Sequence, residues 1–295
     1  MKLTSAVFAV VAAAIASINE ASAFQSQSAF VRGSGRSSVM AAAAPSSSSN
    51  TALCMKTIAV FGASGLTASE CVYQALQDGD KVVGLTRTPS NLKIPTGSGG
   101  DKAGSNLEDP NLTMVAGDVT KKADVDKVFA DQKIDGVIVA LGGKTSDVGD
   151  TMLTDGTKNI IASMKENDVK RLAVVTSIGA GDSKDQAPFF FKILMATAMK
   201  KIFNDKNAQE DVTRASGLEY CIVRPGGLTV EAPTGVVNVI DGQAGSISRA
   251  DVADFCLSAV RDDDFPYIGQ APCISSTGGT SWTKDRSARA REGMQ

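Results

Sequence analysis

A glycine-rich turn between an apolar run and a helical segment is the part of this sequence with the clearest chemical meaning. The run 57–61 is apolar, and Gly62-Ala63-Ser64-Gly65-Leu66-Thr67 follows it directly. Gly62 permits a sharp turn, and Gly65 lets the backbone approach a phosphate without a side chain in the way. The N–H groups that begin the next helix would face that phosphate. The spacing predicts a dinucleotide site that includes Gly62, Ser64, Gly65, Leu66 and Thr67; a purely structural strand-to-helix turn is the alternative.

The end of the second apolar run indicates which dinucleotide is bound. An acidic residue at this point would bind the ribose hydroxyls of NAD, but the sequence continues Thr86-Arg87-Thr88. A guanidinium group can donate two hydrogen bonds to a 2′-phosphate, and the hydroxyl of Thr88 or Ser90 can add another. We therefore expect Arg87 and Thr88 to bind NADP(H). The alternative is a solvated surface arginine.

The residue types that are missing restrict the chemistry further. The chain of 295 residues contains no histidine, which excludes Ser–His and Cys–His nucleophile pairs and every histidine metal site. It also removes the commonest general acid near neutral pH. The five cysteines are scattered and form no C-x-x-C pair, so neither a disulfide framework nor a metal site is predicted. Any reaction must use Tyr, Ser, Lys, carboxylates or a bound cofactor.

Strands and helices alternate around the glycine-rich turn. Apolar runs predict strands at 57–61, 81–86, 112–115, 135–141, 171–177 and 219–223, and the segments 68–77, 151–167 and 187–216 are helical in pattern. Strands that alternate with helices pair in parallel through right-handed crossovers. The expected fold class is α/β, a doubly wound and mainly parallel Rossmann-type sheet with helices on both faces.

Several segments, in this order, resemble the atypical short-chain dehydrogenases with an NmrA-like NAD(P)-binding domain. That group includes biliverdin-IXβ/flavin reductases and plastid assembly proteins. The resemblance covers nearly all of residues 56–260, and its most specific part is Lys206 and Glu210 followed by the run 216–228, SGLEYCIVRPGGL. The run 247–253 resembles the family segment that caps the last core helix. The resemblance implies further cofactor contacts from Asp118, Val119, Ala140, Leu141, Gly142, Thr176, Lys206, Pro225 and Gly226.

One departure from that family bears on catalysis. Typical short-chain dehydrogenases use Tyr-x-x-x-Lys, with the tyrosine as general acid. If Lys206 is that lysine, the tyrosine position holds Ile202, and if Lys192 is, that position holds Pro188. The three tyrosines of the chain fall elsewhere. The remaining catalytic candidates are Ser177, which can orient a carbonyl, and Lys206, with solvent as a further proton source.

Two functions are compatible with these residues. The first is an NADPH-dependent reductase of a small or flat acceptor of the flavin, quinone or tetrapyrrole type. The second is a non-catalytic, NADPH-sensing plastid assembly or scaffold protein, which the missing tyrosine favours. A plastid protein partner and a homodimer both remain open. The net charge of −2 and the lack of a long basic stripe argue against a nucleic-acid partner.

The first 55 residues have the composition of a targeting sequence. Residues 1–23 have the pattern of a signal peptide: Lys2, then an apolar run too short for a membrane span, then Ala21-Ser22-Ala23. Residues 24–55 are Ser-rich and free of acidic residues, as in a disordered transit peptide. With Phe24 after the cleavage site, the pair resembles the bipartite plastid presequence of algae with secondary red plastids, such as diatoms. A membrane anchor and a secreted protein with a disordered linker are the alternatives. The NAD(P)-binding domain is expected at 56–280, and the polar tail 281–295 is expected to be disordered.

Two further segments stand out. The run 188–195 is unusually apolar, and we expect an ordinary buried helix face. A roof over a flat acceptor, a dimer contact and a membrane-surface contact are the alternatives. The long segment 89–110 contains Gly97-Ser98-Gly99-Gly100 and is expected to be a flexible surface insertion, with a lid as the alternative. No integral membrane span is predicted.

Overall fold

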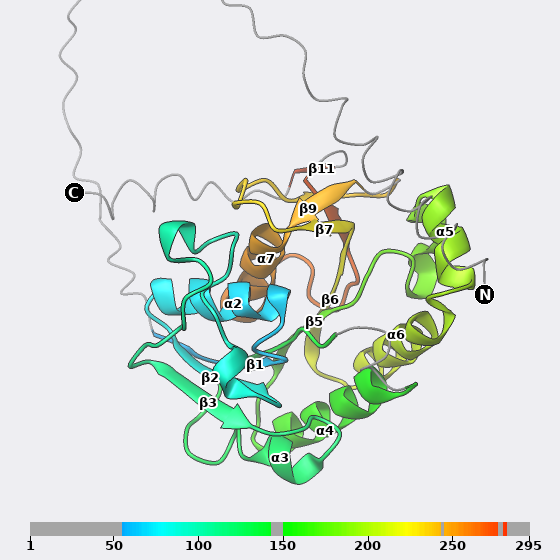
Figure 1. Cartoon of the computed structure of the whole chain (residues 1–295). Coiled ribbons are helices and arrows are strands. Elements are labelled where there is room, and N and C mark those ends of the chain that lie inside the picture. Colours follow the sequence, from blue (N-terminus) through cyan, green and yellow to red (C-terminus); the bar gives the residue numbers. More distant parts are fainter. Residues whose placement is uncertain (1–54, 143–149, 243–244, 277–279, 282–295) are drawn as a thin grey trace, which may run out of the picture. The chain divides into compact units, whose positions relative to one another are not determined.

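The computed structural model describes residues 55–142, 150–242, 245–276 and 280–281. Residues 1–54, which make up nearly all of the expected presequence 1–55, and the tail beyond Ser281 lie outside these residues. The described part contains one large sheet and one small sheet (Figure 1). The large sheet is formed by β1 (Thr57–Phe61), β2 (Lys81–Thr86), β3 (Leu112–Ala116), β4 (Gly136–Val139), β5 (Arg171–Val175), β6 (Glu219–Pro225), β8 (Asn238–Val239), β10 (Cys273–Ser275) and β11 (Thr280–Ser281). The small sheet pairs β7 (Gly227–Thr229) with β9 (Ser246–Ser248) in parallel.

The strand order creates a crevice at the carboxyl ends of the central strands. The order is β11-β8-β10-β6-β5-β4-β1-β2-β3, and every pair from β3 through to β10 is parallel. The chain moves outward from β1 to β3 and then returns to the other side of β1 with β4. Such a reversal leaves the loops after β1 and β4 diverging, which is where doubly wound sheets bind ligands.

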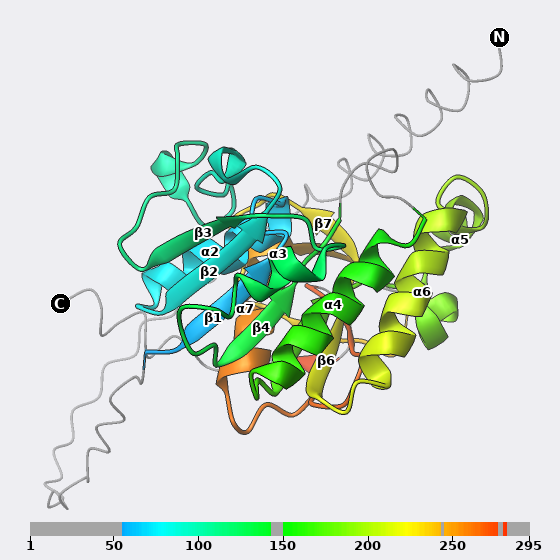
Figure 2. The ribbon, with the colours of Figure 1, turned by 90° about the horizontal axis from the view of Figure 1, so that it is seen from below.

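Helices cover both faces of the sheet, as the sequence predicts (Figure 2). They are α2 (Leu66–Gln77), α3 (Lys122–Asp126), α4 (Met152–Glu166), α5 (Phe189–Ala196), α6 (Lys200–Arg214) and α7 (Arg249–Arg261). Side chains alternate along β1, so Ile58 and Val60 join a core with α2 and α7, whereas Ala59 and Phe61 join a core with α3 and α4. The expected doubly wound α/β fold is therefore confirmed.

The prediction of one continuous helix over 187–216 is wrong. The segment is two helices, α5 and α6, and the break lies at Thr197, whose φ and ψ of −116° and −94° are not helical.

The expected burial of the apolar run 188–195 is also wrong. Phe189 is 68% exposed and Phe190 is 83% exposed. Of the three phenylalanines, Phe191 turns inward, and its ring packs edge-on against Phe203 at 5.8 Å between centroids.

The segment between β2 and β3 is fixed to the helical layer. It contains two short 3₁₀ helices, η1 (Pro89–Asn91) and η2 (Gly100–Lys102). The buried carboxylate of Glu70 in α2 accepts hydrogen bonds from the backbone N–H groups of Gly97 (2.9 Å) and Ser98 (3.2 Å). A buried carboxylate with two such partners holds the segment in place, so this part of the expected flexible insertion is anchored on α2.

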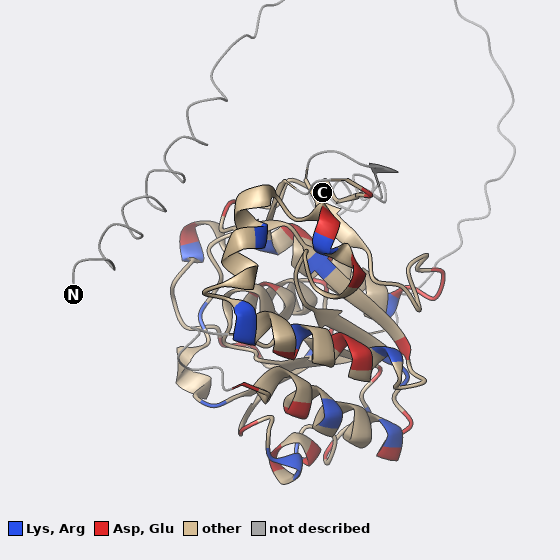
Figure 3. Cartoon of the chain, turned by 90° about the vertical axis from the view of Figure 1, so that its right-hand side faces the viewer, with Lys and Arg blue, Asp and Glu red and all other residues tan. Residues whose placement is uncertain are grey.

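Charge is evenly mixed over the surface, without a continuous stripe of one sign on the side seen in Figure 3. In α6, Lys200 and Lys201 are followed by Asp205, Glu210 and Asp211. Across the described ranges, none of the helices combines the length and apolarity that crossing a bilayer requires.

Candidate functional site

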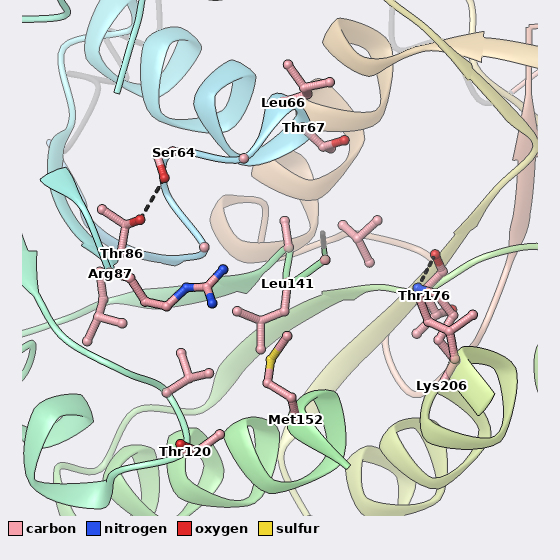
Figure 4. A pocket seen from close by; sticks show the side chains of 18 of the residues that line it. Ser64, Leu66, Thr67, Thr86, Arg87, Thr120, Leu141, Met152, Thr176 and Lys206 are labelled. Carbon is pink, nitrogen blue, oxygen red and sulfur yellow. Dashed lines mark hydrogen bonds between the residues drawn. The ribbon is translucent and has the colours of Figure 1, made fainter. Parts of the chain in front are cut away.

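A cavity of about 1070 Å³ opens at the carboxyl ends of the central strands (Figure 4). The loops after β1, β2, β3 and β4 form one side of it, and the beginnings of α2 and α4 close on it. The end of β5, one face of α6, β7 and the first residue of α7 form the rest. The cavity therefore occupies the crevice that the strand order creates.

The glycine-rich turn is shaped for close approach. Gly62 has a φ of +83°, and a Cβ added there would lie 2.7 Å from the carbonyl oxygen of Ala140. Both the backbone conformation and the lack of space therefore require glycine. The N–H of Ser69 bonds back to the oxygen of Gly65 at 2.7 Å. The N–H groups of the preceding residues at the start of α2 are then available to a phosphate.

The loop is tied to the end of β2 beside the predicted 2′-phosphate site. The hydroxyls of Ser64 and Thr86 share a hydrogen bond of 2.6 Å, and the exposed side chain of Arg87 extends into the cavity from the same strand end (Figure 4). Asp118 follows β3 nearby. The N–H and hydroxyl of Thr120 both donate to its carboxylate, which lowers the pKa of Asp118, with smaller help from Lys121 and Arg87. This end of the cavity thus carries one cation and one ionised carboxylate.

Lys206 marks the other end of the cavity. Its ammonium group donates to the backbone oxygen of Thr176, at the end of β5, over 3.0 Å. Burial lowers the pKa of Lys206 to about 8, although the charges of Glu210 and Asp205 oppose this. Thr176 in turn donates its hydroxyl to Glu210 at 2.8 Å. One turn of α6 therefore fixes both residues against the cavity wall.

Glu210 belongs to a buried ion pair behind the cavity. Its side chain is 1% exposed, and Arg224 in β6, which is 3% exposed, donates to it at 3.0 and 2.5 Å. Burial disfavours the charged guanidinium, but the hydrogen bonds and charges of Glu210 and Asp182 outweigh it, so the pKa of Arg224 is raised. The pair joins α6 to β6 and positions Thr176 and Lys206.

The position that a catalytic tyrosine would occupy is apolar in the structure. Ile202 and Lys206 lie one turn apart on α6, and both line the cavity. Tyr73, Tyr220 and Tyr267 are not among the described residues that line it. The departure noted in the sequence is thus a feature of the site itself.

Most of the predicted site residues come together here. Those that line the cavity are Gly62, Ser64, Gly65, Leu66, Thr67, Arg87, Asp118, Val119, Ala140, Leu141, Gly142, Thr176 and Lys206.

Four predicted site residues do not line it. Thr88 is exposed and precedes η1. Ser177 lies one residue beyond the lining residue Thr176, and its hydroxyl donates to the oxygen of Ile178 at 3.0 Å. Pro225 is buried at the end of β6, and the N–H of Gly226 donates to the oxygen of Ile274 at 3.0 Å.

Several residues that line the cavity are not among those predicted from the sequence. They include Thr86, Gly117, Thr120, Thr151, Met152, Asp155, Met199, Leu228 and Arg249. Those after strands could have been found from the rule that ligands bind at the carboxyl ends of parallel strands. Leu228 and Arg249 belong to β7 and to the start of α7. Nothing in their spacing indicated that these two segments meet.

Comparison with known proteins agrees with this geometry. The NAD(P)H-binding family model matches residues 62–263. An uncharacterised chloroplastic protein of Arabidopsis thaliana, At2g34460, is 30% identical over 225 residues, which cover 72% of this chain and 74% of that protein. A Rossmann-fold NAD(P)-binding protein from Shigella flexneri superposes with a TM-score of 0.54 at 26% identity, over 78% of this chain and 98% of that one. ChuY, an anaerobilin reductase of Escherichia coli O157:H7, shares the fold with a TM-score of 0.58 at 23% identity, over 75% of this chain and 97% of that one.

These matches define the class of protein. The family model covers more than half of the chain and includes the glycine-rich turn and the predicted lysine. The chain belongs to the NAD(P)H-binding family, and its fold and cavity are those of an oxidoreductase-like member.

Proposed function

We propose that the protein is an NADPH-dependent reductase of a small or flat acceptor. The observation that carries the choice of cofactor is Arg87, which extends into the cavity from the end of β2, where an NAD-specific site would place a carboxylate. A guanidinium group matches the two-pronged geometry of a phosphate.

The residues that line the cavity fit such a cofactor from end to end. Arg87 would bind the 2′-phosphate, and the open N-terminus of α2 would bind the pyrophosphate. Lys206 would donate to the hydroxyls of the nicotinamide ribose, next to Thr176. When bound, the cofactor supplies the hydride, and the protein contributes position and electrostatics.

The class of acceptor follows from the side chains that surround the nicotinamide end. Met199, Ile202 and Leu228 are apolar, and none of the described residues that line the cavity is a tyrosine that could protonate a carbonyl oxygen. Conjugated acceptors that spread the incoming charge need little acid catalysis, so we favour flavins, quinones and tetrapyrroles over simple ketones. ChuY of Escherichia coli O157:H7, which has the same fold, is an anaerobilin reductase.

NADPH oxidation by the purified chain tests this function. Flavin, quinone and linear tetrapyrrole acceptors should each be compared with simple ketones. The same assays should be run with Lys206→Ala, the variant that weakens cofactor binding. The proposal expects turnover with at least one conjugated acceptor and poor turnover with ketones. Fast ketone reduction that collapses in Ser177→Ala, with cofactor affinity unchanged, would overturn it.

A second function has support of its own. The missing tyrosine and the chloroplastic relative At2g34460 favour an NADPH-sensing plastid protein that binds a partner without turnover. Tight NADPH binding without oxidation by any acceptor class would favour this second function. Under both functions we place the protein in a plastid, to which the presequence-like residues 1–55 would direct it.

A further inference from the structure

Arg249 is the cation of the cavity that the proposed cofactor site leaves without a role. It is the first residue of α7 and lines the cavity together with Leu228 of β7. One nitrogen of its guanidinium donates to the backbone oxygens of Thr229 (3.0 Å) and Leu228 (3.4 Å). These bonds hold the side chain against β7 and leave its remaining donors for another partner.

Arg249 has no acidic partner within salt-bridge distance among the described residues. Glu70 is the nearby carboxylate that acts on its charge, but both Glu70 oxygens accept backbone N–H groups of the 89–110 segment. Partial burial removes water from Arg249 and lowers its pKa. A half-buried guanidinium without a counter-ion is costly in the free protein and favours an anionic ligand.

Arg249 lies between α2, where Glu70 acts on its charge, and β7, whose carbonyl groups hold it. Arg87 lies at the end of β2, on one side of β1 in the sheet. The carbonyl groups that hold Arg249 belong to β7, which directly follows β6 on the other side of β1. In the proposed site, Arg87 and the start of α2 would bind the 2′-phosphate and the pyrophosphate. Arg249 contacts the backbone of Leu228, an apolar residue of the cavity lining, so its remaining donors lie next to the apolar surface proposed for the acceptor.

We propose that Arg249 binds an acidic oxyanion group, a carboxylate or a phosphate, of the electron acceptor. The acceptor then has a flat apolar body against Leu228 and Ile202 and an acidic group on the Arg249 guanidinium. This inference rests on the proposed reductase function and narrows its acceptors. Conjugated molecules that carry an acidic side group are expected to bind, and their neutral counterparts are expected to bind poorly.

Calorimetric binding to the purified chain saturated with NADP⁺ tests the proposal without turnover. Two matched pairs of probes are titrated: flavin mononucleotide against riboflavin, and an anthraquinone carboxylate against its carboxamide. In the unmodified chain, the acidic member of at least one pair should bind about tenfold more tightly. Arg249→Gln should abolish that preference and leave the affinity for NADP⁺ within about twofold. Arg249→Lys should keep part of the preference, because it keeps the charge but loses the fork.

Arg171→Gln is the matched control, because Arg171 is a partly buried arginine at the first residue of β5, paired with Glu219 and outside the cavity. It should leave both probe pairs unchanged. Equal binding of acidic and neutral probes by the unmodified chain would overturn the proposal. So would an Arg249→Gln variant that loses NADP⁺ affinity but keeps the probe preference, since Arg249 would then serve the pyrophosphate. Failure to bind NADP⁺ at all in the unmodified chain would instead refute the proposed function, and the probes can still be compared in its absence.

Discussion

The ammonium group of Lys206 lies 3.0 Å from the backbone oxygen of Thr176, and this hydrogen bond joins α6 to the end of β5 at the floor of the cavity. The relationship is maintained from behind by Glu210, which accepts the hydroxyl hydrogen of Thr176. The side chain of Lys206 is thus held in a fixed position at the cavity and is shielded from water. The Lys206 ammonium group therefore loses its proton within a pH range in which the protein can be studied.

We predict that NADPH affinity falls as the pH rises above about 8. Burial lowers the pKa of Lys206 to about 8, so the group is charged below that pH and neutral above it. A neutral amine is a weaker donor to the ribose hydroxyls. The dissociation constant, measured by fluorescence titration across this range, should rise steadily in the unmodified chain and stay flat in Lys206→Met. An affinity that does not change with pH in the unmodified chain would contradict this role.

The buried pair of Glu210 and Arg224 should be needed for stability. Arg224→Met leaves the Glu210 carboxylate buried without its cation, and such a loss costs about 3–5 kcal/mol of unfolding free energy. Replacing both partners, as in Glu210→Leu with Arg224→Met, should cost much less, because no charge is left unpaired. Urea unfolding of the unmodified chain and of the two variants checks this. Equal losses of unfolding free energy in the single and double variants would show that packing, rather than charge, causes the loss.

Gly62 and Gly79 provide a matched test of the glycine-rich turn. Both have positive φ, +83° and +85°, but a Cβ at Gly79 would meet nothing within 4 Å, whereas one at Gly62 would meet the oxygen of Ala140. Gly79→Ala should cost about 1–2 kcal/mol, from backbone strain alone. Gly62→Ala should cost more and should also lose NADPH binding, because the turn must shift. Intact NADPH affinity in Gly62→Ala would speak against this phosphate site.

The fold could be predicted because its signals are local and periodic. The apolar run 57–61, the glycines of the turn and the alternation of strands with helices identify a doubly wound sheet before any contact is known. The same reasoning finds Arg87, because the end of β2 has a fixed role in such sheets. The family resemblance adds Lys206, and the structure places it in the cavity.

What could not be predicted depends on contacts between distant segments. The break between α5 and α6 lies at Thr197, an ordinary residue whose backbone departs from the helix where the two helices diverge. Arg249 lies in the cavity because β7 and β9 pair with each other, and two three-residue strands give no periodic signal. The hydroxyl of Ser177 makes it a catalytic candidate in the sequence, but the direction of a side chain just after a strand depends on the following turn. That turn directs the Ser177 hydroxyl to the oxygen of Ile178.

We predict that residues 1–55 carry a reporter into a plastid. The motive is the Ala21-Ser22-Ala23-Phe24 junction, followed by a Ser-rich segment without acidic residues. A fluorescent protein fused behind residues 1–55 should accumulate in the plastid of a diatom, and Phe24→Ala should leave it outside. Reporter that stays outside the organelle with Phe24 intact would refute this localisation.

The most direct test of the central claim is the ratio of NADPH to NADH affinity, measured by calorimetry on the purified chain. The account predicts that NADPH binds about 10- to 100-fold more tightly, as expected for charge-assisted hydrogen bonds from Arg87 to the 2′-phosphate. Arg87→Ala should remove most of this preference without weakening NADH binding, and Arg171→Ala, outside the cavity, should preserve it. Equal affinities for the two cofactors in the unmodified chain would contradict the account.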